Sequence, residues 1–276
     1  MSDEFATRYG PWAVIAGASD GVGAAFADAL AERGLNVVLL ARRQAVLDDV
    51  AASIRQRYGV ETRTLAIDLA VSGAAASVID ATADLEVGFL VYCAGADPDF
   101  TPFLSNSIAA AETMVQRNCV VPMQLSHHYA APMVQRGAEA GSWCSGPGGP
   151  VSSVAPNMVA YGASKAFDMV FAEALWSELH DKGVDVIGLI LGKTDTPALR
   201  KLEYQRGTLA SEDQMPTDAV PVGGDVVSEA FANLTNGPTV LVGEQMRGVG
   251  QLLASMDRND AARLMAQSIA AAMGSD

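Results

Sequence analysis

A tyrosine and a lysine, Tyr161 and Lys165, stand four residues apart in the motif YGASK, at the start of a helical pattern. This spacing of one helical turn places the phenol and the ammonium on the same helix face. A free phenol ionises only near pH ~10, and a neighbouring cation stabilises its ionised form. Such a pair can exchange a proton with a carbonyl or an alcohol near neutral pH. A tyrosine and a lysine at this spacing are common in proteins, so whether they form an active site depends on the elements around them.

A glycine-rich turn lies between the first β-rich run, residues 12–16, and the first helical pattern, residues 22–33. Glycines let the backbone approach a pyrophosphate, whose charge the free N–H groups and the dipole of a helix N-terminus stabilise. Its place in the first βα unit favours a nucleotide site over a purely structural turn. The turn residues expected to contact a cofactor are Gly17, Ser19, Asp20, Gly21, Val22 and Gly23.

Two arginines, Arg42 and Arg43, follow the second β-rich run, where an enzyme selective for NAD usually carries an acidic residue. A guanidinium at this place pairs with a 2′-phosphate. The alternative is that the arginines only solvate the start of a helix, but basic charge there opposes the helix dipole. We therefore predict that NADP(H) is favoured over NAD(H).

Strand and helix patterns alternate through the first half of the chain in the order βαβαβαβ, which is typical of parallel strands joined by helices. We predict an α/β protein: a single-domain, Rossmann-like doubly wound parallel sheet with helices on both faces, spanning residues 1–276. Residues 194–221 are expected to form a substrate lid, and residues 245–273 a C-terminal helical segment. Strands are expected at 12–16, 36–41, 62–67, 87–93, 184–191 and 238–242, and further helices at 46–59, 72–85, 108–136, 160–182 and 225–234.

The 276-residue chain carries 32 Asp+Glu and 18 Lys+Arg, a net charge of −14 at pH 7. This charge repels a phosphate backbone, so nucleic acid is not expected as a partner. The apolar runs are shorter than the ~18 residues that a membrane span needs. The acidic start lacks the basic residues of a signal peptide, and the three cysteines are not closely paired, which favours a cytoplasmic location. His127 and His128 diverge on a helix without further ligands, so no metal site is predicted.

Together these motifs resemble the short-chain dehydrogenase/reductase family over nearly the whole chain, and especially its branch that reduces 3-oxoacyl thioesters and 17-keto steroids, the 17β-hydroxysteroid dehydrogenase-like branch. The resemblance implies Tyr161 as the general acid/base and Lys165 as its pKa modulator and ribose ligand. It implies Asn118 as the anchor of a water-linked proton relay. Further cofactor contacts are implied at Asp68, which is expected near the adenine, and at Leu69, Ala94, Gly95, Gly192, Thr194 and Thr196.

The chain departs from the family pattern at several places. Ala16, the pair Tyr92-Cys93, and Leu191 replace supporting residues, at an expected cost of one or two hydrogen bonds or some rigidity each. The substrate-polarising serine of the family stands some fourteen residues before the tyrosine, where this chain has Pro147.

The segment 142–150, rich in glycine and proline, is not predicted as a central strand. One explanation is a local shift of the reading frame in the coding DNA. The other is that Ser145, Ser152 or Ser153 reaches the site through an unusual loop, and we assign the role to Ser152.

These observations predict an NADP(H)-dependent oxidoreductase that interconverts a ketone and a secondary alcohol on an apolar small molecule, 3-oxoacyl or steroid-like. The alternative is a dinucleotide-binding protein of the same fold with weak or no catalysis, because the polarising serine is displaced or missing. A third hypothesis is a structural oligomer of this fold. We expect a homodimer or homotetramer, with residues 109–135 and 160–180 in the interface.

Overall fold

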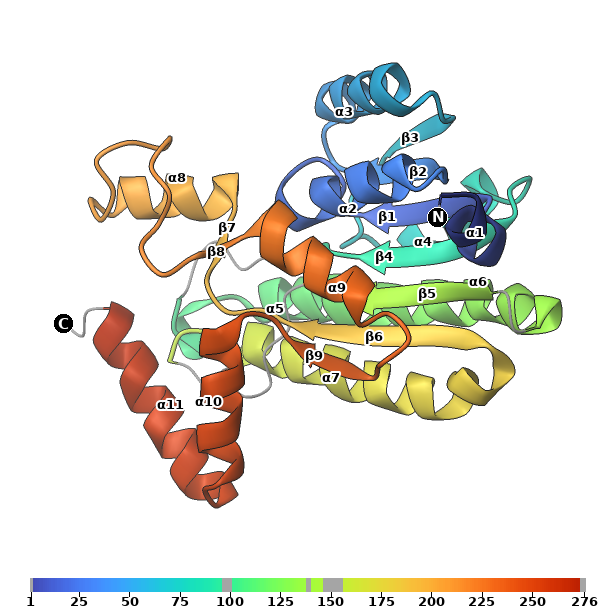
Figure 1. Cartoon of the computed structure of the whole chain (residues 1–276). Helices are drawn as coiled ribbons and strands as arrows, with labels where there is room; N and C mark the ends of the chain where they lie inside the picture. Colours follow the sequence, from blue (N-terminus) through green and yellow to red (C-terminus); the bar gives the residue numbers. More distant parts are fainter. Residues whose placement is uncertain (1, 96–100, 138–139, 146–155, 274–276) are drawn as a thin grey trace.

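The computed structural model describes the backbone of residues 2–95, 101–137, 140–145 and 156–273, and their side chains outside residues 2–3, 140–145 and 271–273. Within these residues, seven parallel strands form one sheet in the order β3-β2-β1-β4-β5-β6-β9 (Figure 1). The predicted doubly wound parallel sheet is therefore confirmed. The strands are β1 (Trp12–Ala16), β2 (Asn36–Ala41), β3 (Thr62–Ala66), β4 (Val87–Tyr92), β5 (Ala140–Ser145), β6 (Val184–Ile190) and β9 (Thr239–Leu241).

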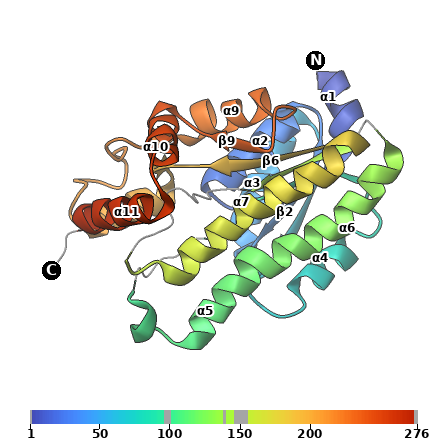
Figure 2. The same ribbon diagram turned by 90° about the horizontal axis from the view of Figure 1, so that it is seen from below.

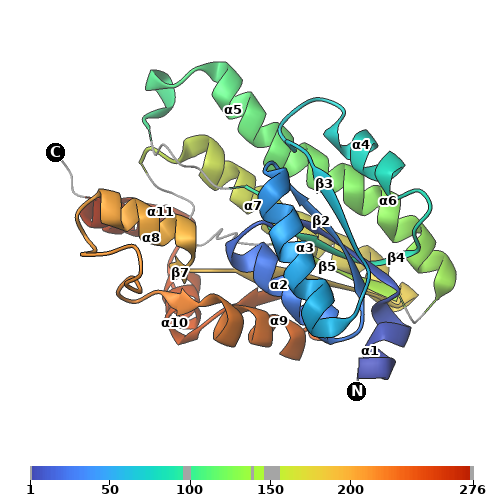
Figure 3. The same ribbon diagram turned by 90° about the horizontal axis from the view of Figure 1, so that it is seen from above.

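Helices cover both faces of the sheet. Figure 2 and Figure 3 show α2, α3 and α9 on one side of the sheet and α4, α6 and α7 on the other. Each helix buries an apolar stripe, such as Phe26 and Leu30 of α2 on the first face and Leu125 and Tyr129 of α6 on the second. The bounds are α2 (Gly21–Glu32), α3 (Gln44–Tyr58), α4 (Ala74–Ala81), α6 (Val121–Arg136), α7 (Val159–Leu179) and α9 (Ser228–Ala232), with π-helical turns η2 (Gln116–Val120) before α6 and η4 (Val222–Val227) before α9 and short 3₁₀ turns η1 (Phe103–Ser105) and η3 (His180–Lys182).

The sequence-based interpretation of segment 142–150 is wrong for its first part, because β5 is a central strand. Its residues pair with β4 on one side and with β6 on the other, so that Ser145 lies opposite Tyr92 and Gly188. Pairing on two sides satisfies the backbone of this strand, which overrides the low strand propensity of its glycine and serines. The prolines at 147 and 150, which argued against a strand, follow its end.

A first helix, α1 (Ser2–Tyr9), precedes the elements that the sequence pattern predicted. Arg8 and Tyr9 both donate to the carboxylate of Asp185, at 2.8 and 2.6 Å, and Asp185 is the second residue of β6. The Phe5 ring packs against Phe89 and other aromatic rings of the core. Helix α1 thus covers the edge of the sheet at which the strands begin (Figure 1).

The predicted lid, residues 194–221, contains the short strands β7 (Thr194–Asp195) and β8 (Val220–Pro221) and the helix α8 (Pro197–Gln205) between them. Thr196 caps α8, because its hydroxyl accepts from the N–H of Leu199 at 3.2 Å. The C-terminal segment forms two helices, α10 (Glu244–Ala254) and α11 (Arg258–Met273), which project as a hairpin from the sheet (Figure 1). On the face of the sheet covered by α6 and α7, α5 (Ile108–Val115) continues through η2 into α6.

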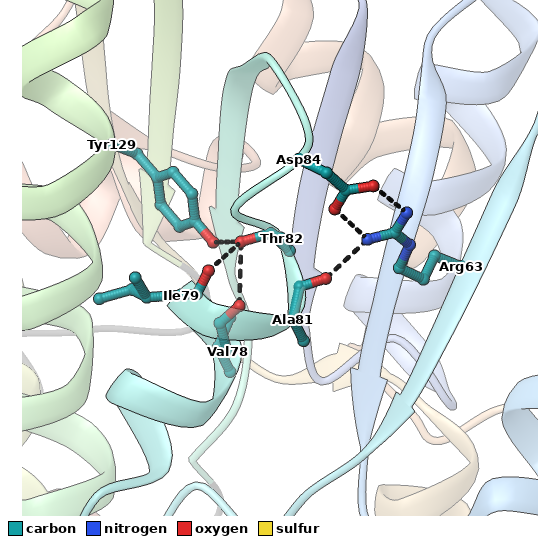
Figure 4. Close-up of polar contacts among 7 residues, drawn as sticks. All are labelled: Arg63, Val78, Ile79, Ala81, Thr82, Asp84 and Tyr129. Atoms are coloured by element: carbon teal, nitrogen blue, oxygen red, sulfur yellow. Dashed lines mark hydrogen bonds and ion pairs between the residues drawn. The ribbon is translucent and has the colours of Figure 1, made fainter.

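A polar network joins α4, α6 and β3 away from the carboxyl edge of the sheet (Figure 4). The buried Thr82 hydroxyl donates to the carbonyl of Val78 at 2.9 Å and lies 2.7 Å from the Tyr129 hydroxyl. Arg63 of β3 makes two parallel hydrogen bonds, at 2.7 and 2.8 Å, to the carboxylate of Asp84. These contacts fix the end of α4 and the loop that leads into β4.

Candidate active site

The residues predicted to act together follow five different strands, β1, β2, β3, β4 and β6, or lie in η2 and α7. Because the strands are parallel, their carboxyl ends meet at one edge of the sheet. In the sheet order, β1 neighbours β4, so the chain reverses its winding direction between these two strands. In open α/β sheets, ligands bind in the crevice outside such a switch point.

The glycine turn after β1 is packed so closely that side chains do not fit. Gly17 has a φ of +86°, and a Cβ on it would lie 3.0 Å from the backbone nitrogen of Ala94. A Cβ on Gly23 would overlap the carbonyl oxygen of Gly17. The N–H groups of Gly17 and Ala18 donate to the carbonyl of Leu40, which ties the turn to β2. The turn therefore leaves a cradle of bare backbone beneath the start of α2.

The N-terminus of α2 points into this cradle. Asp20 caps the helix, because its carboxylate accepts from the N–H of Gly21 at 2.6 Å. Val22 is buried in the helix interface, while Ser19 is half-buried. A Cβ on Gly21 would lie 3.1 Å from the methyl group of Thr196. The structure thus brings the loop after β6 against the glycine turn.

Arg42 and Arg43 are exposed at the end of β2, two residues beyond the carbonyl that holds the turn. Arg43 occupies the N-cap position of α3 without a side-chain cap bond. Among the residues that the structure describes, neither guanidinium has a hydrogen-bond or ion-pair partner. After β3, Asp68 is exposed and accepts from the N–H of Ala70 at 3.0 Å, and Leu69 is buried.

These features fit a dinucleotide. The bare cradle and the helix N-terminus suit a pyrophosphate, and the two unpartnered guanidinium groups suit a further phosphate beside it. The carboxylate of Asp68 supplies an acceptor at the adjoining strand end.

Asn118 is buried in the π-helical turn η2, with a side chain that is 1% exposed. Its amide donates to the Ser164 hydroxyl at 2.8 Å, and Ser164 donates to the carbonyl of Tyr161 at 2.7 Å. A Cβ on Gly95, whose φ is +128°, would overlap the Asn118 amide oxygen. This contact chain joins the loop after β4, the turn η2 and the first turn of α7, so the position of Tyr161 is linked to that of Asn118. Ala94, beside Gly95, backs the glycine turn.

Tyr92 supplies a contact that the sequence analysis did not expect. A π-helical turn leaves a backbone carbonyl out of the regular hydrogen-bond ladder, and the Tyr92 hydroxyl donates to the carbonyl of Arg117 in η2. Burial raises the pKa of Tyr92, so this phenol stays a donor. At Cys93, burial raises the pKa of the thiol to about 12. The pair Tyr92-Cys93, which departs from the family pattern, therefore contributes a hydrogen bond of its own.

Tyr161 and Lys165 lie in the first turns of α7 with the geometry that their spacing predicts. The Lys165 ammonium lies 5.7 Å from the centre of the Tyr161 ring. The Tyr161 hydroxyl has no hydrogen-bond partner among the described residues, and the side chain is half-buried. The Lys165 side chain is 4% exposed and donates to Asp168 at 2.9 Å. Burial lowers the pKa of Lys165, but the carboxylate of Asp168 and the phenol outweigh it, so the pKa is raised.

The remaining predicted residues fall into two groups. Thr194 is buried, and its hydroxyl donates to the carbonyl of Gly192 at 3.1 Å, which shapes the loop after β6. Ser152, Ser153 and Pro147 lie outside the described residues. Ser145 is the last residue of β5, and its backbone therefore lies at the same sheet edge as Tyr92.

An apolar cavity of about 240 Å³ lies beside the start of α7. Its wall includes Ala160, the residue before Tyr161. The other lining residues come from the chain around η1, from α5 and from the start of α7, and include Phe103, Leu104, Ile108, Met114 and Val159. The lining of this cavity ends at Ala160, so an apolar molecule in it would lie at the N-terminal end of α7, the helix on which Tyr161 and Lys165 follow.

Residues 11–207 match the short chain dehydrogenase family. The chain belongs to this family. A 7beta-hydroxysteroid dehydrogenase from Collinsella aerofaciens is 35% identical to this short-chain dehydrogenase over 238 residues, which are 86% of this chain and 88% of that protein. A human very-long-chain 3-oxoacyl-CoA reductase is 31% identical over 205 residues, 70% of this chain and 64% of that protein.

Solved structures agree with this assignment. A structure from a study of 7beta-hydroxysteroid dehydrogenase stereoselectivity has a TM-score of 0.83 and 31% identity, and it covers 95% of this chain and 98% of that chain. A short-chain dehydrogenase from Sphingobium yanoikuyae in complex with NADPH has a TM-score of 0.68 and 27% identity, with 90% and 96% covered. The short-chain dehydrogenase described here is an NAD(P)-dependent oxidoreductase that acts on CH–OH groups of small molecules.

The described residues of this dehydrogenase also bear on other site types. In that part of the chain, no helix is long and apolar enough to cross a membrane. Within the same ranges, no three His, Cys, Asp or Glu side chains are grouped so that they could hold a metal ion.

The sequence analysis of this dehydrogenase missed Ser164, Asp168 and the role of Tyr92. Ser164 belongs to the YGASK motif, and its place three residues after Tyr161 could have indicated a bond back along the helix. Asp168 stands three residues after Lys165 in an otherwise apolar stretch of α7, which was the available signal for a buried ion pair. No feature of the sequence near Tyr92 predicts its hydrogen bond to η2.

Proposed function

We propose that this dehydrogenase interconverts a ketone and a secondary alcohol on an apolar, steroid-like or 3-oxoacyl substrate, with NADP(H) preferred over NAD(H). The observation that carries the proposal is the Tyr161 hydroxyl, which has no partner among the described residues and stands beside the buried ammonium of Lys165. It lies on the helix that begins at the apolar cavity.

The chain's own residues would hold the cofactor at the carboxyl edge. The glycine turn and the N-terminus of α2 suit the pyrophosphate, and Arg42 with Arg43 suits a 2′-phosphate. Lys165 has two more N–H donors for ribose hydroxyls beyond the one that Asp168 accepts. When bound, the cofactor would give a hydride to the carbonyl carbon in reduction and would accept the hydride of the alcohol carbon in oxidation. The residues assigned to these contacts are Gly17, Ser19, Asp20, Gly21, Val22, Gly23, Arg42, Arg43, Asp68, Leu69, Ala94, Gly95, Gly192, Thr194 and Thr196.

Tyr161 moves the proton. In reduction its hydroxyl donates to the carbonyl oxygen, and in oxidation the phenolate takes the proton of the alcohol. The Lys165 ammonium stabilises that phenolate through space. Asn118 holds Ser164, and Ser164 holds the backbone of Tyr161, so both keep the phenol in place. The donor that polarises the carbonyl is assigned to Ser152.

The substrate class rests on two supports. The cavity at the start of α7, whose wall includes Ala160, is lined mainly by aliphatic and aromatic side chains, which suits an apolar ring system or acyl chain. The similar proteins include a 7beta-hydroxysteroid dehydrogenase and a very-long-chain 3-oxoacyl-CoA reductase. Both supports, with the Tyr161–Lys165 geometry, favour this function over a cofactor-binding protein without catalysis.

The test is NADPH consumption with a panel that contains a steroid ketone, a 3-oxoacyl thioester and a small polar sugar ketone. We expect turnover with an apolar member. Tyr161→Phe should lower kcat at least about a hundredfold, because it removes only the transferable proton. Lys165→Met should lower both kcat and NADPH affinity.

Binding of NADPH, measured by quenching of tryptophan fluorescence, is the control for Tyr161→Phe. Its dissociation constant should stay within about threefold of the wild type, because the ring packing is kept. A Tyr161→Phe variant that keeps wild-type turnover would contradict the assigned role. Turnover only of the polar ketone would contradict the substrate class.

A further inference from the structure

We infer that Asp168 is a positioning residue of the reaction, which acts through Lys165 by fixing its ammonium and balancing its charge beside Tyr161. The inference rests on the proposed function, because it assigns a role toward the proton transfer by Tyr161.

The geometry is that of a buried ion pair. The Lys165 ammonium donates to the Asp168 carboxylate at 2.9 Å, and the two side chains are 4% and 5% exposed. A lysine side chain has four rotatable bonds, so it loses rotamer entropy when it is held in one conformer. The bond to Asp168, three residues along the same helix, selects one conformer of the lysine. Its remaining N–H donors are then oriented before any ligand arrives.

A carboxylate in this place needs a partner, because α7 buries it among apolar and weakly polar groups. In the described part of the chain, the titratable groups that face the pair from other elements include Cys93 after β4, Cys119 in η2 and Tyr92 at the end of β4. Burial raises the pKa of the Cys93 thiol to about 12 and that of the Cys119 thiol to about 11, so both are neutral in the working pH range. Tyr92 is neutral as well, since burial raises its pKa.

Arg117 is a further charge beside this cluster, and its guanidinium donates to the Asn118 amide at 3.1 Å. At neutral pH the Asp168 carboxylate is thus the negative charge that opposes the Lys165 ammonium at Tyr161. The phenol meets an ammonium whose field the carboxylate partly cancels, rather than a bare cation.

This arrangement predicts a pH effect with a definite sign. Removing the negative charge makes every neighbouring acid lose its proton more easily, whether the proton leaves the phenol or the ammonium of the coupled pair. The form of the site that accepts a proton from an alcohol should therefore appear at lower pH in Asp168→Asn than in the wild type. A residue that only supported the fold would change the rate or the melting temperature but would leave this midpoint in place.

The experiment uses the full chain and compares the wild type with Asp168→Asn, Asp168→Glu and the control Glu178→Gln. Glu178→Gln makes the same charge change on the exposed end of α7. The pH midpoint of kcat for oxidation of a steroid alcohol is measured together with the NADPH dissociation constant. Asp168→Asn should move the midpoint down by half a pH unit or more and weaken NADPH binding about tenfold. Asp168→Glu should bring the pH midpoint most of the way back to the wild-type value. Glu178→Gln should have the midpoint and the NADPH affinity of the wild type.

A thermal cycle tests the pair without any turnover. Alone, Asp168→Asn should lower Tm, because it leaves an unpaired buried ammonium. In the Lys165→Met background the same substitution should raise Tm, because it removes a buried negative charge that has lost the ammonium opposing it. This reversal of sign supports the pair, and additive losses overturn it.

The outcomes separate the inference from the proposed function. A wild-type chain that oxidises and reduces no tested substrate contradicts the proposed function, and the NADPH affinities and the thermal cycle then decide whether Asp168 fixes Lys165. An active wild type with an unshifted midpoint in Asp168→Asn overturns the inference and leaves the proposed function standing. If Asp168→Asn alone does not fold, the thermal cycle decides: Asp168→Asn in the Lys165→Met background should melt at a higher temperature than Lys165→Met alone, and a lower Tm there would overturn the inference.

Discussion

Single side chains at the carboxyl edge divide into those with partners inside the protein and those without. Asn118 and Lys165 are buried and hydrogen-bonded, which gives them one position each. Arg42 and the Tyr161 hydroxyl have no such partner among the described residues. The first kind sets the geometry, and the second kind is available to a ligand. A site built in this way reorganises little when a ligand binds.

Arg42→Ala should weaken NADPH binding about tenfold, or about 1.4 kcal/mol, and should leave NADH binding nearly unchanged. The reason is that the guanidinium would lose its contact to the 2′-phosphate, which NADH lacks. Titrations monitored by tryptophan fluorescence give the four dissociation constants. Arg258→Ala, an exposed arginine at the start of α11, is the control for the change in charge. Equal affinities of the wild type for the two cofactors would rule out the preference.

How much of the site the sequence reveals depends on whether the contact is local. Tyr161 and Lys165 lie one turn apart on a helix, so their meeting follows from spacing alone. The bond from Tyr92 to Arg117 spans 25 residues and exists because β4 ends next to η2. No rule of spacing predicts such a contact, because it depends on how a strand and a helix pack.

At the scale of elements, the order of strands and helices was predictable and one strand was not. Nearly continuous apolar runs marked β1, β2, β4 and β6, because these strands are buried by helices on both faces. Strand β5 lacks such a pattern, and its place in the sheet follows from its pairing with β4 and β6. The hypothesis of a shifted reading frame in segment 142–150 stays a prediction, which resequencing of the coding DNA tests.

The network between α4 and α6 should respond asymmetrically to the loss of its two hydroxyl groups. Tyr129→Phe leaves Thr82 bonded to the carbonyl of Val78, so we expect a loss of about 1 kcal/mol in the free energy of unfolding. Thr82→Val leaves the buried Tyr129 hydroxyl without its partner, and the loss should reach about 1–3 kcal/mol. Urea unfolding measures both.

The double variant Thr82→Val with Tyr129→Phe is the control for this pair. Its loss should be smaller than the sum of the two single losses, because it leaves no orphaned phenol. Strict additivity would mean that the two hydroxyl groups do not interact.

The contact between β3 and the loop after α4 should weaken in acid. The hydrogen-bonded guanidinium of Arg63 lowers the pKa of Asp84 to about 2, below the ordinary value of about 3.9. A carboxyl whose pKa is lower in the folded state stabilises the fold above about pH 4, and this contribution fades as the pH falls from about 4 to about 2. Asp84→Asn should therefore reduce the urea midpoint at pH 6 more than at pH 3. Asp49→Asn, an exposed aspartate of α3, should show no such difference.

For the whole molecule, we propose self-association through the helices of one face. Exposed apolar side chains stand along α5, α6 and α7, among them Ile108, Val115, Met123 and Val170. Such side chains gathered on helices of one layer are typical of an interface. Figure 2 shows these helices side by side on the outer face of the sheet.

We expect a homodimer or homotetramer by light scattering at micromolar concentration. The double variant Met123→Glu with Val170→Glu should shift the mass to that of a monomer, because it would bring carboxylates together in the interface. Leu252→Glu, an equally exposed apolar residue of α10, is the matched control and should keep the wild-type mass. A wild-type chain that is monomeric at this concentration would refute the proposal.

The two edges of the sheet carry different kinds of residue, and this has a practical consequence. Helix α1 is fastened to Asp185 at the beginning of β6, whereas the loop after β6 reaches the glycine turn. The seven residues of β6 separate these two places by ~23 Å, as a rigid spacer would. Substitutions around α1 that stabilise the fold should therefore lengthen the half-life of the enzyme at raised temperature without changing its turnover number. Directed evolution can therefore change residues near the start of the strands to improve thermal stability. In separate rounds it can change residues near their carboxyl ends to alter substrate preference.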